Sequence, residues 1–176
     1  AHVPGRLSNM ETALAEALYL TSVERNADVV EMTSYAPLLA KKGHTQWRPD
    51  LIYFTNDSVM PTTDYYVQWL YGNNSGTTYV PAPLQVFTTD EDVATRVGMS
   101  IVKDESTGEY IVKLVNMLPV EVMGEVDLTP LDIKSAVAAG WRMHGAPQAT
   151  DVKPQPVTAT LPHITLPPYS FTVLRI

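Results

Sequence analysis

Apolar and polar residues alternate along residues 8–28 with the spacing of an amphipathic helix. Five apolar or small positions recur every three or four residues and would share one face of that helix: Met10, Leu14, Ala17, Leu18 and Thr21. Ser8 with Glu11 three residues later has the form of a capping box, which marks the expected start. Asn26 marks the expected end. The first element is therefore predicted to be a helix that packs on a core through one face.

A short apolar run follows this helix. Residues 28–35, DVVEMTSY, predict a buried strand, and Pro37 should end it because proline has no amide hydrogen. A strand directly after a helix is typical of a parallel α/β unit. One such unit cannot cover its own sheet edges, because a parallel strand needs neighbours on both sides. The start of the chain is therefore expected to be the closing section of a larger α/β structure.

A second helix is predicted after a long loop. Residues 61–72 have helical spacing, with Thr62 or Thr63 as the N-cap and Gly72 as the end. The expected buried stripe consists of Tyr66, Trp69 and Leu70. The sequence up to residue 76 therefore predicts the order helix, strand, long loop, helix.

The pattern changes after Gly76, beyond which ten of the 14 prolines lie and no helical spacing remains. Residues 94–117 predict two strands joined by a turn at Thr107–Gly108. Residues 120–127 alternate between two faces, one with Val120, Val122, Gly124 and Val126 and the other with Glu121, Met123, Glu125 and Asp127. Two further strands are expected at residues 157–161 and 169–176. Several short strands separated by proline and glycine are typical of an antiparallel sandwich.

Composition narrows the classes of function. The 176 residues carry a net charge of −7 and no cluster of lysine and arginine, which argues against nucleic-acid binding. There is no cysteine, and the four histidines lack paired ligand spacing, so neither a metal nor any other cofactor is expected. No apolar run approaches the roughly 20 residues of a membrane helix, so we expect no membrane partner.

The residues of three segments resemble glycoside hydrolase family 51, the α-L-arabinofuranosidases. These segments are LAEALYLTSVERNADVVEMTSYAPLLAKKGHTQWRPDLIYFTN, PTTDYYVQWLYGNN and the terminal LPPYSFTVLRI. The resemblance implies an α/β fragment of a (β/α)8 TIM barrel, residues 1–76, followed by an all-β, jelly-roll-like antiparallel sandwich, residues 77–176. It also implies the C-terminal part of a retaining enzyme that removes terminal arabinofuranosyl groups from plant polysaccharides such as arabinan and arabinoxylan.

The family uses two glutamates, whose carboxyl groups lie roughly 5 Å apart in retaining glycosidases. In the family one follows the fourth barrel strand in an Asn-Glu pair and the other follows the seventh strand. Neither motif occurs in this chain, so the resemblance assigns no catalytic residue here. The outer-helix glutamates do not replace them. We expect the chain alone to be inactive and to need the missing N-terminal part of the same enzyme.

The resemblance places the end of the predicted strand and the long loop beside the sugar site. The expected substrate-lining residues are Tyr35, His44, Gln46, Trp47 and Asn56. An indole can stack on the C–H face of a sugar while amides and imidazoles bond its hydroxyls. Each residue also has a structural alternative to lining the substrate. Trp47 could be buried beneath the loop, and His44 could be an ordinary exposed loop residue. Tyr35 could pack between barrel and helix, and Asn56 could only form a turn.

Two further readings of the whole chain stay open. The sandwich could be a non-catalytic structural or carbohydrate-binding module, with Trp141 and His144 as a possible sugar patch. The chain could also be a self-standing domain unrelated to a barrel. The expected partners are an arabinofuranosyl-containing polysaccharide or oligosaccharide and, through exposed apolar edges, a second copy of the chain in a homo-oligomer. We expect an extracellular or periplasmic location, and a cytoplasmic one stays open.

Overall fold

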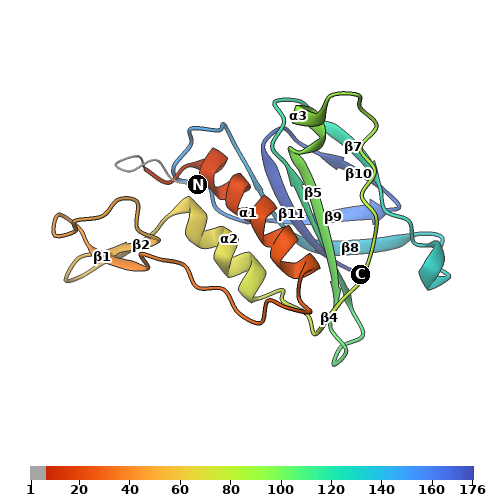
Figure 1. Ribbon diagram of the computed structural model, residues 1–176, viewed down its shortest axis with the longest axis horizontal. Coiled ribbons are helices and arrows are strands. Elements are labelled where there is room, and N and C mark those ends of the chain that lie inside the picture. Colours follow the sequence, from red (N-terminus) through yellow and green to blue (C-terminus); the bar gives the residue numbers. More distant parts are fainter. Residues whose placement is uncertain (1–6) are drawn as a thin grey trace.

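Two helices cover one face of a six-stranded antiparallel sheet in the computed structural model, which describes residues 7–176 (Figure 1). The helices are α1 (Met10–Arg25) and α2 (Thr63–Gly72). In spatial order the sheet consists of β4 (Thr78–Tyr79), β5 (Val97–Lys103), β6 (Tyr110–Asn116), β11 (Ser170–Arg175), β8 (Ala136–His144) and β9 (Gln155–Leu161). The strand that is last in sequence therefore lies in the middle of the sheet.

A second, two-stranded sheet lies against the opposite face of the large sheet. It pairs β7 (Val122–Glu125) with β10 (His163–Leu166). Two short helical elements connect strands: α3 (Glu91–Ala94) before β5 and a 3-10 turn (Thr129–Leu131) before β8. The fold is thus mostly sheet with a few helices, and the predicted antiparallel sandwich is confirmed.

Two apolar cores follow from this layering, one on each face of the large sheet. Strand β6 is buried on both faces: Ile111 and Val115 point towards the helices, whereas Val112 and Leu114 point towards β7 and β10. This explains why most residues of β6 are apolar and all but Tyr110 are buried, whereas burial alternates along β7. Burial of apolar surface in both cores is the main force that holds the layers together.

The first helix begins at a different cap from the one predicted. Asn9, not Ser8, is the N-cap: its side chain accepts a hydrogen bond from Thr12 N at 2.9 Å, and Asn9 N donates to Thr12 Oγ1 at 3.0 Å. Asparagine caps a helix about as well as serine, so the sequence pattern could not distinguish the two neighbouring residues. The predicted N-cap at Ser8 is therefore wrong. The predicted end at Asn26 is confirmed.

The second helix has the predicted bounds, with Thr62 as its N-cap and Gly72 as its last residue. Its buried apolar side chains are Val67, Leu70 and Tyr71, whereas Tyr66 and Trp69 are only half-buried at the margin of the core. The buried face of α2 therefore lies about one residue further along the chain than the predicted stripe. The Tyr71 ring stacks on Phe171 of β11, with 5.3 Å between centroids, which fixes the rotation of α2 on the sheet.

The predicted strand at residues 28–35 is not formed. Val29 and Val30 donate their amides to Asn26 O in a turn, and the following residues to Tyr35 form neither helix nor strand. Val29 is 74% exposed and Met32 is 86% exposed. An apolar run becomes a strand only where neighbouring strands accept its hydrogen bonds, and residues 7–176 supply none at this place.

The predicted long loop contains a small sheet that the sequence pattern did not reveal. Strand β1 (Leu39–Lys41) pairs in parallel with β2 (Ile52–Phe54), which pairs in antiparallel with β3 (Val59–Pro61). Figure 1 shows this sheet at one end of the molecule, beyond the start of α2 and away from β7 and β10. Three residues per strand are too few for periodicity to show.

A buried ion pair joins α1 to the sheet inside the helix-side core. Lys113 Nζ, on a side chain with no exposed surface, lies 2.6 Å from Glu24 Oε1. Ser100 Oγ donates to Glu24 Oε2 at 2.5 Å, and the ammonium also lies 5.2 Å from the centroid of the Tyr71 ring. Burial lowers the pKa of Lys113, and the Glu24 carboxylate opposes that shift. The charge of Lys113 is therefore kept in the core by Glu24.

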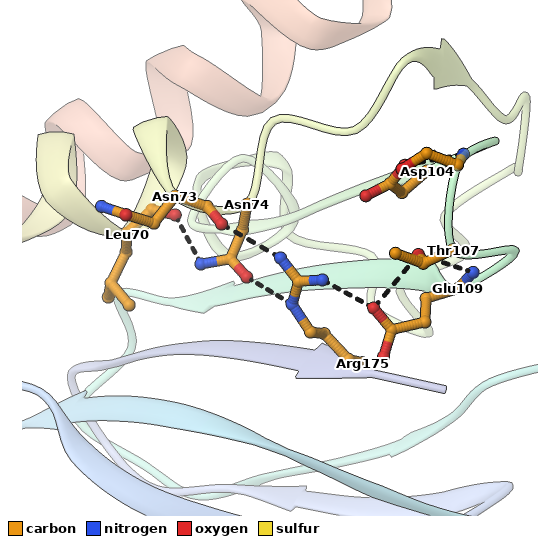
Figure 2. Close-up of polar contacts among 8 residues, drawn as sticks. Leu70, Asn73, Asn74, Asp104, Thr107, Glu109 and Arg175 are labelled. Atoms are coloured by element: carbon orange, nitrogen blue, oxygen red, sulfur yellow. Dashed lines mark hydrogen bonds and ion pairs between the residues drawn. The ribbon is translucent and has the colours of Figure 1, made fainter.

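A second polar network fastens the end of α2 to the end of β11. Arg175 donates to Asn74 Oδ1 at 2.9 Å, to Asn73 O at 3.0 Å and to Glu109 Oε2 at 2.7 Å (Figure 2). Asn74 in turn donates to Leu70 O at 2.8 Å and so satisfies a carbonyl of the last helical turn. One guanidinium thus connects the helix layer, the last strand and the turn before β6.

Candidate functional site

The loop between β1 and β2 presents an exposed tryptophan. Trp47 is 70% exposed, although its backbone is fixed: Trp47 N donates to Thr45 Oγ1 at 3.1 Å. The same hydroxyl lies 2.9 Å from Trp47 O and 3.3 Å from the carboxylate of Asp50, which is itself buried. A positioned but uncovered indole has the geometry that stacking on a sugar ring requires. The alternative of a Trp47 buried under the loop is wrong for this chain.

The other predicted lining residues fall into three environments. His44 and Gln46 are exposed in the same loop as Trp47, where His44 N donates to Lys41 O at 2.9 Å. Asn56 is exposed in the turn between β2 and β3. Tyr35 is half-buried, and burial, followed by the nearby carboxylates of Asp64 and Glu16, raises the pKa of its phenol. The structure brings together only the three loop residues.

A cavity of about 450 Å³ opens beside this loop. Its walls come from the β1–β2 loop, from β2 and β3, from the cap of α2, from the residues before α1 and from Thr150. Its polar lining includes Ser8, Lys42, Arg48 and Tyr53, whereas none of the five predicted residues lines it. The pattern of the sequence offers no signal for this set, because Leu7, Ser8 and Thr150 lie far along the chain from the remaining lining residues, which fall within residues 42–62.

Two carboxyl groups meet between α1 and α2. Gln68 Nε2 donates to Glu16 Oε1, and Thr12 Oγ1 lies 3.1 Å from Asp64 Oδ1. Burial raises the pKa of Glu16 to about 7, an increase that the hydrogen bond from Gln68 opposes and the Asp64 carboxylate reinforces. Glu16 therefore carries a proton over part of the physiological pH range.

We expect Glu16→Gln to remove a pH dependence from the stability of the fold. The pKa of Glu16 is raised in the folded state, so its contribution favours folding below its ordinary value of 4.5 and is lost as the pH rises to about 7. A shift of this size corresponds to about 3 kcal/mol. Urea unfolding at pH 5 and pH 8 checks this: the variant should lose less stability between the two than the parent chain. An unchanged difference would contradict the assignment.

The second predicted patch is partly structural. Trp141 packs edge-to-face against Trp69 of α2, with ring centroids 5.9 Å apart, and retains 36% of its surface exposed. His144 Nδ1 lies 2.9 Å from Pro168 O. Trp141 thus joins β8 to α2 and His144 joins β8 to the segment before β11, while both side chains remain partly open to solvent.

Within residues 7–176, no helix is both long and apolar enough to cross a membrane. The same part of the chain contains no group of three or more acidic, histidine or cysteine side chains arranged to hold a metal ion.

Comparisons with known proteins agree on one family. A family model described as "Alpha-L-arabinofuranosidase C-terminal domain" matches residues 2–170. The chain is 46% identical over 84 residues to the extracellular exo-alpha-L-arabinofuranosidase of Streptomyces chartreusis, a match that covers 48% of this chain and 10% of the relative. It is 38% identical over 110 residues to alpha-L-arabinofuranosidase A of Aspergillus kawachii, which covers 61% of this chain and 16% of the relative.

Solved structures agree with the sequence comparison. The arabinose-bound structure of MgGH51 α-L-arabinofuranosidase superimposes with a TM-score of 0.84 at 27% identity, covering 97% of this chain and 28% of that one. The Thermotoga maritima α-L-arabinofuranosidase shares the fold, with a TM-score of 0.74 at 15% identity over 97% of this chain and 39% of that one. The chain thus spans well under half of these relatives. Since the family match includes nearly all of its residues, the chain belongs to the alpha-L-arabinofuranosidase C-terminal domain family.

Proposed function

We propose that this chain is the C-terminal part of a retaining α-L-arabinofuranosidase that removes terminal arabinofuranosyl groups from plant polysaccharides such as arabinan and arabinoxylan. The observation that carries the proposal is the family match over residues 2–170. In this proposal residues 1–76 are the closing β/α units of a TIM barrel and residues 77–176 are the sandwich. Both catalytic glutamates come from the remainder of the enzyme.

The exposed surface of the first part supports this arrangement. Val29, in the turn after α1, and Met32, shortly beyond it, expose apolar side chains that no described strand covers, which is the condition expected of a barrel strand without its neighbours. In the proposal the remaining barrel strands cover this segment. Without them, the uncovered apolar side chains favour association of two copies of the chain.

The proposal gives the loop residues a role at the rim of the sugar site. Trp47 stacks on a sugar ring, His44 and Gln46 bond its hydroxyls, and Asn56 and Tyr35 lie at the margins of the site. The exposure and fixed backbone of Trp47 support the first of these roles. The relative named as extracellular in Streptomyces chartreusis supports an extracellular location for this protein as well.

Two measurements test the proposal. The 176-residue chain should not hydrolyse 4-nitrophenyl α-L-arabinofuranoside, whereas a chimera that carries it in place of the matching C-terminal segment of the Streptomyces relative should. In the chimera, Trp47→Ala should lower kcat/KM by about two- to tenfold, the range expected for one aromatic contact. Phe87→Ala is the matched control, because Phe87 is 95% exposed and lies outside the loop.

Turnover by the 176-residue chain alone would reject the placement of the glutamates, and equal kinetics of the two alanine variants would reject the role of Trp47.

The partly exposed Trp141 supports a second candidate, a carbohydrate-binding module in the sandwich. Calorimetric binding of arabino-oligosaccharides that Trp141→Ala abolishes and Trp47→Ala leaves intact would favour that module.

A further inference from the structure

The cavity beside the β1–β2 loop carries two cations without counterions. Lys42 and Arg48 both line it and both are exposed, and neither side chain forms a hydrogen bond or ion pair with any residue in the part of the chain that the structure describes. None of the side chains that line the cavity is a carboxylate. In a chain with a net charge of −7, this is a local concentration of positive charge. It favours an anionic ligand.

A buried hydroxyl in the same cavity indicates that the ligand also offers a hydrogen-bonding group. Ser8 is 5% exposed, and its Oγ has no hydrogen-bond partner within residues 7–176. A buried hydroxyl left without a partner destabilises a fold, and such a group is uncommon in native proteins. Ser8 is also not the helix cap, a role that belongs to Asn9. A bound ligand that carries hydroxyl groups would supply the missing partner.

The rest of the lining fits a ring with apolar faces. Leu7, Met60 and Pro61 contribute apolar walls, and Tyr53 adds an aromatic ring whose hydroxyl already accepts a hydrogen bond from Asp50 N at 3.0 Å. The volume of about 450 Å³ lies within the range of small-molecule sites. A ligand that matches all three features has a carboxylate, several hydroxyls and C–H faces. That combination describes a uronic acid.

We propose that this cavity binds a uronic acid residue of a carbohydrate chain, with its carboxylate facing Lys42 and Arg48 and a hydroxyl bonded to Ser8. A guanidinium and an ammonium suit this ligand, because both form charge-assisted hydrogen bonds to carboxylates. The inference rests on the proposed function and narrows it: the preferred polysaccharide carries acidic sugars near its arabinofuranosyl groups.

Calorimetry or amide chemical-shift titration of the 176-residue chain tests the inference, with methyl glucuronide and methyl glucoside as matched probes. The glucuronide should bind about tenfold more tightly at low ionic strength, and the difference should shrink in about 0.5 M salt because exposed charges are screened. Lys42→Gln and Arg48→Gln should each weaken glucuronide binding by about three- to fivefold. Lys41→Gln is the control, since Lys41 is exposed next to the site but does not line it.

Ser8→Ala separates binding from folding. It should weaken glucuronide binding by about threefold or more while leaving the thermal midpoint unchanged or slightly higher, because it removes an unsatisfied buried hydroxyl. Equal binding of the two glycosides, or no binding of the glucuronide at its highest soluble concentration, would overturn the inference. If inorganic phosphate bound as tightly as the glucuronide, the cavity would recognise only negative charge, and the claim that it recognises a sugar would be overturned. The proposed function is tested with a neutral arabinofuranoside, so either proposal can fail alone.

Discussion

Glu24→Gln is expected to destabilise the fold by about 3 kcal/mol, as measured by urea unfolding at pH 7. The substitution keeps the shape of the side chain and a group that can bond Ser100, but it removes the charge that offsets Lys113. Because Lys113 is fully buried, its ammonium would then be left in the core without a counter-charge, next to a neutral amide and the Tyr71 ring. Breaking one partner of a buried pair is costly for this reason.

Two further variants make this prediction specific. Glu11→Gln, in the exposed first turn of the same helix, should change the stability by less than about 1 kcal/mol. The double variant Glu24→Leu with Lys113→Met should recover most of the loss, since an apolar pair can replace a buried ion pair. The loss in Glu24→Gln should also shrink as the pH rises, because lysine can be buried once it is neutral. A loss below about 1 kcal/mol in Glu24→Gln would refute the coupling.

Gly140→Ala is expected to cost about 3 kcal/mol, at the upper end of the range for overpacking. Gly140 lies in β8 where this strand pairs with β11, and a Cβ there would meet Val173 O at 1.9 Å and Val173 C at 2.9 Å. Those atoms belong to the backbone of a central strand, so no change of rotamer can relieve the clash. Thermal unfolding of the variant should show the loss as a lowered midpoint.

Gly124→Ala in β7 is the matched control. A Cβ at Gly124 would lie 3.4 Å from Ile164 Cγ2, which is ordinary van der Waals contact. Alanine also loses less chain entropy on folding than glycine, so this variant should be neutral or more stable by up to about 1 kcal/mol. If both alanine variants lowered the midpoint equally, the close approach of β8 and β11 would not be the cause.

The elements that the sequence predicted correctly are those whose signal is local. The helix ending at Asn26, the helix from Thr63 to Gly72 and the hairpin around Thr107–Gly108 each carry their periodicity and end signals within one short stretch. The cap at Asn9 was misassigned because adjacent serine and asparagine residues are equally suited to the role. Local sequence signals therefore predicted the type of each of these elements more reliably than the residue at which it begins.

The errors concern features that depend on distant parts of the chain. Residues 28–35 have the composition of a strand, but pairing requires neighbours that residues 7–176 do not provide. The candidate site shows the same limit. Trp47 could be selected from its residue type and its loop, whereas the cavity joins Ser8, Tyr53 and Thr150 only in the folded chain. No periodicity relates those three positions.

The place of β11 in the sheet has a consequence for synthesis on the ribosome. The hairpins β5–β6 and β8–β9 are joined in the large sheet only through residues 170–175, which pair with both. Until those six residues have left the exit tunnel, the nascent chain holds two separate ribbons with open edges. Such edges bind chaperones or other nascent chains, so the large sheet is expected to be completed only after β11 has been translated.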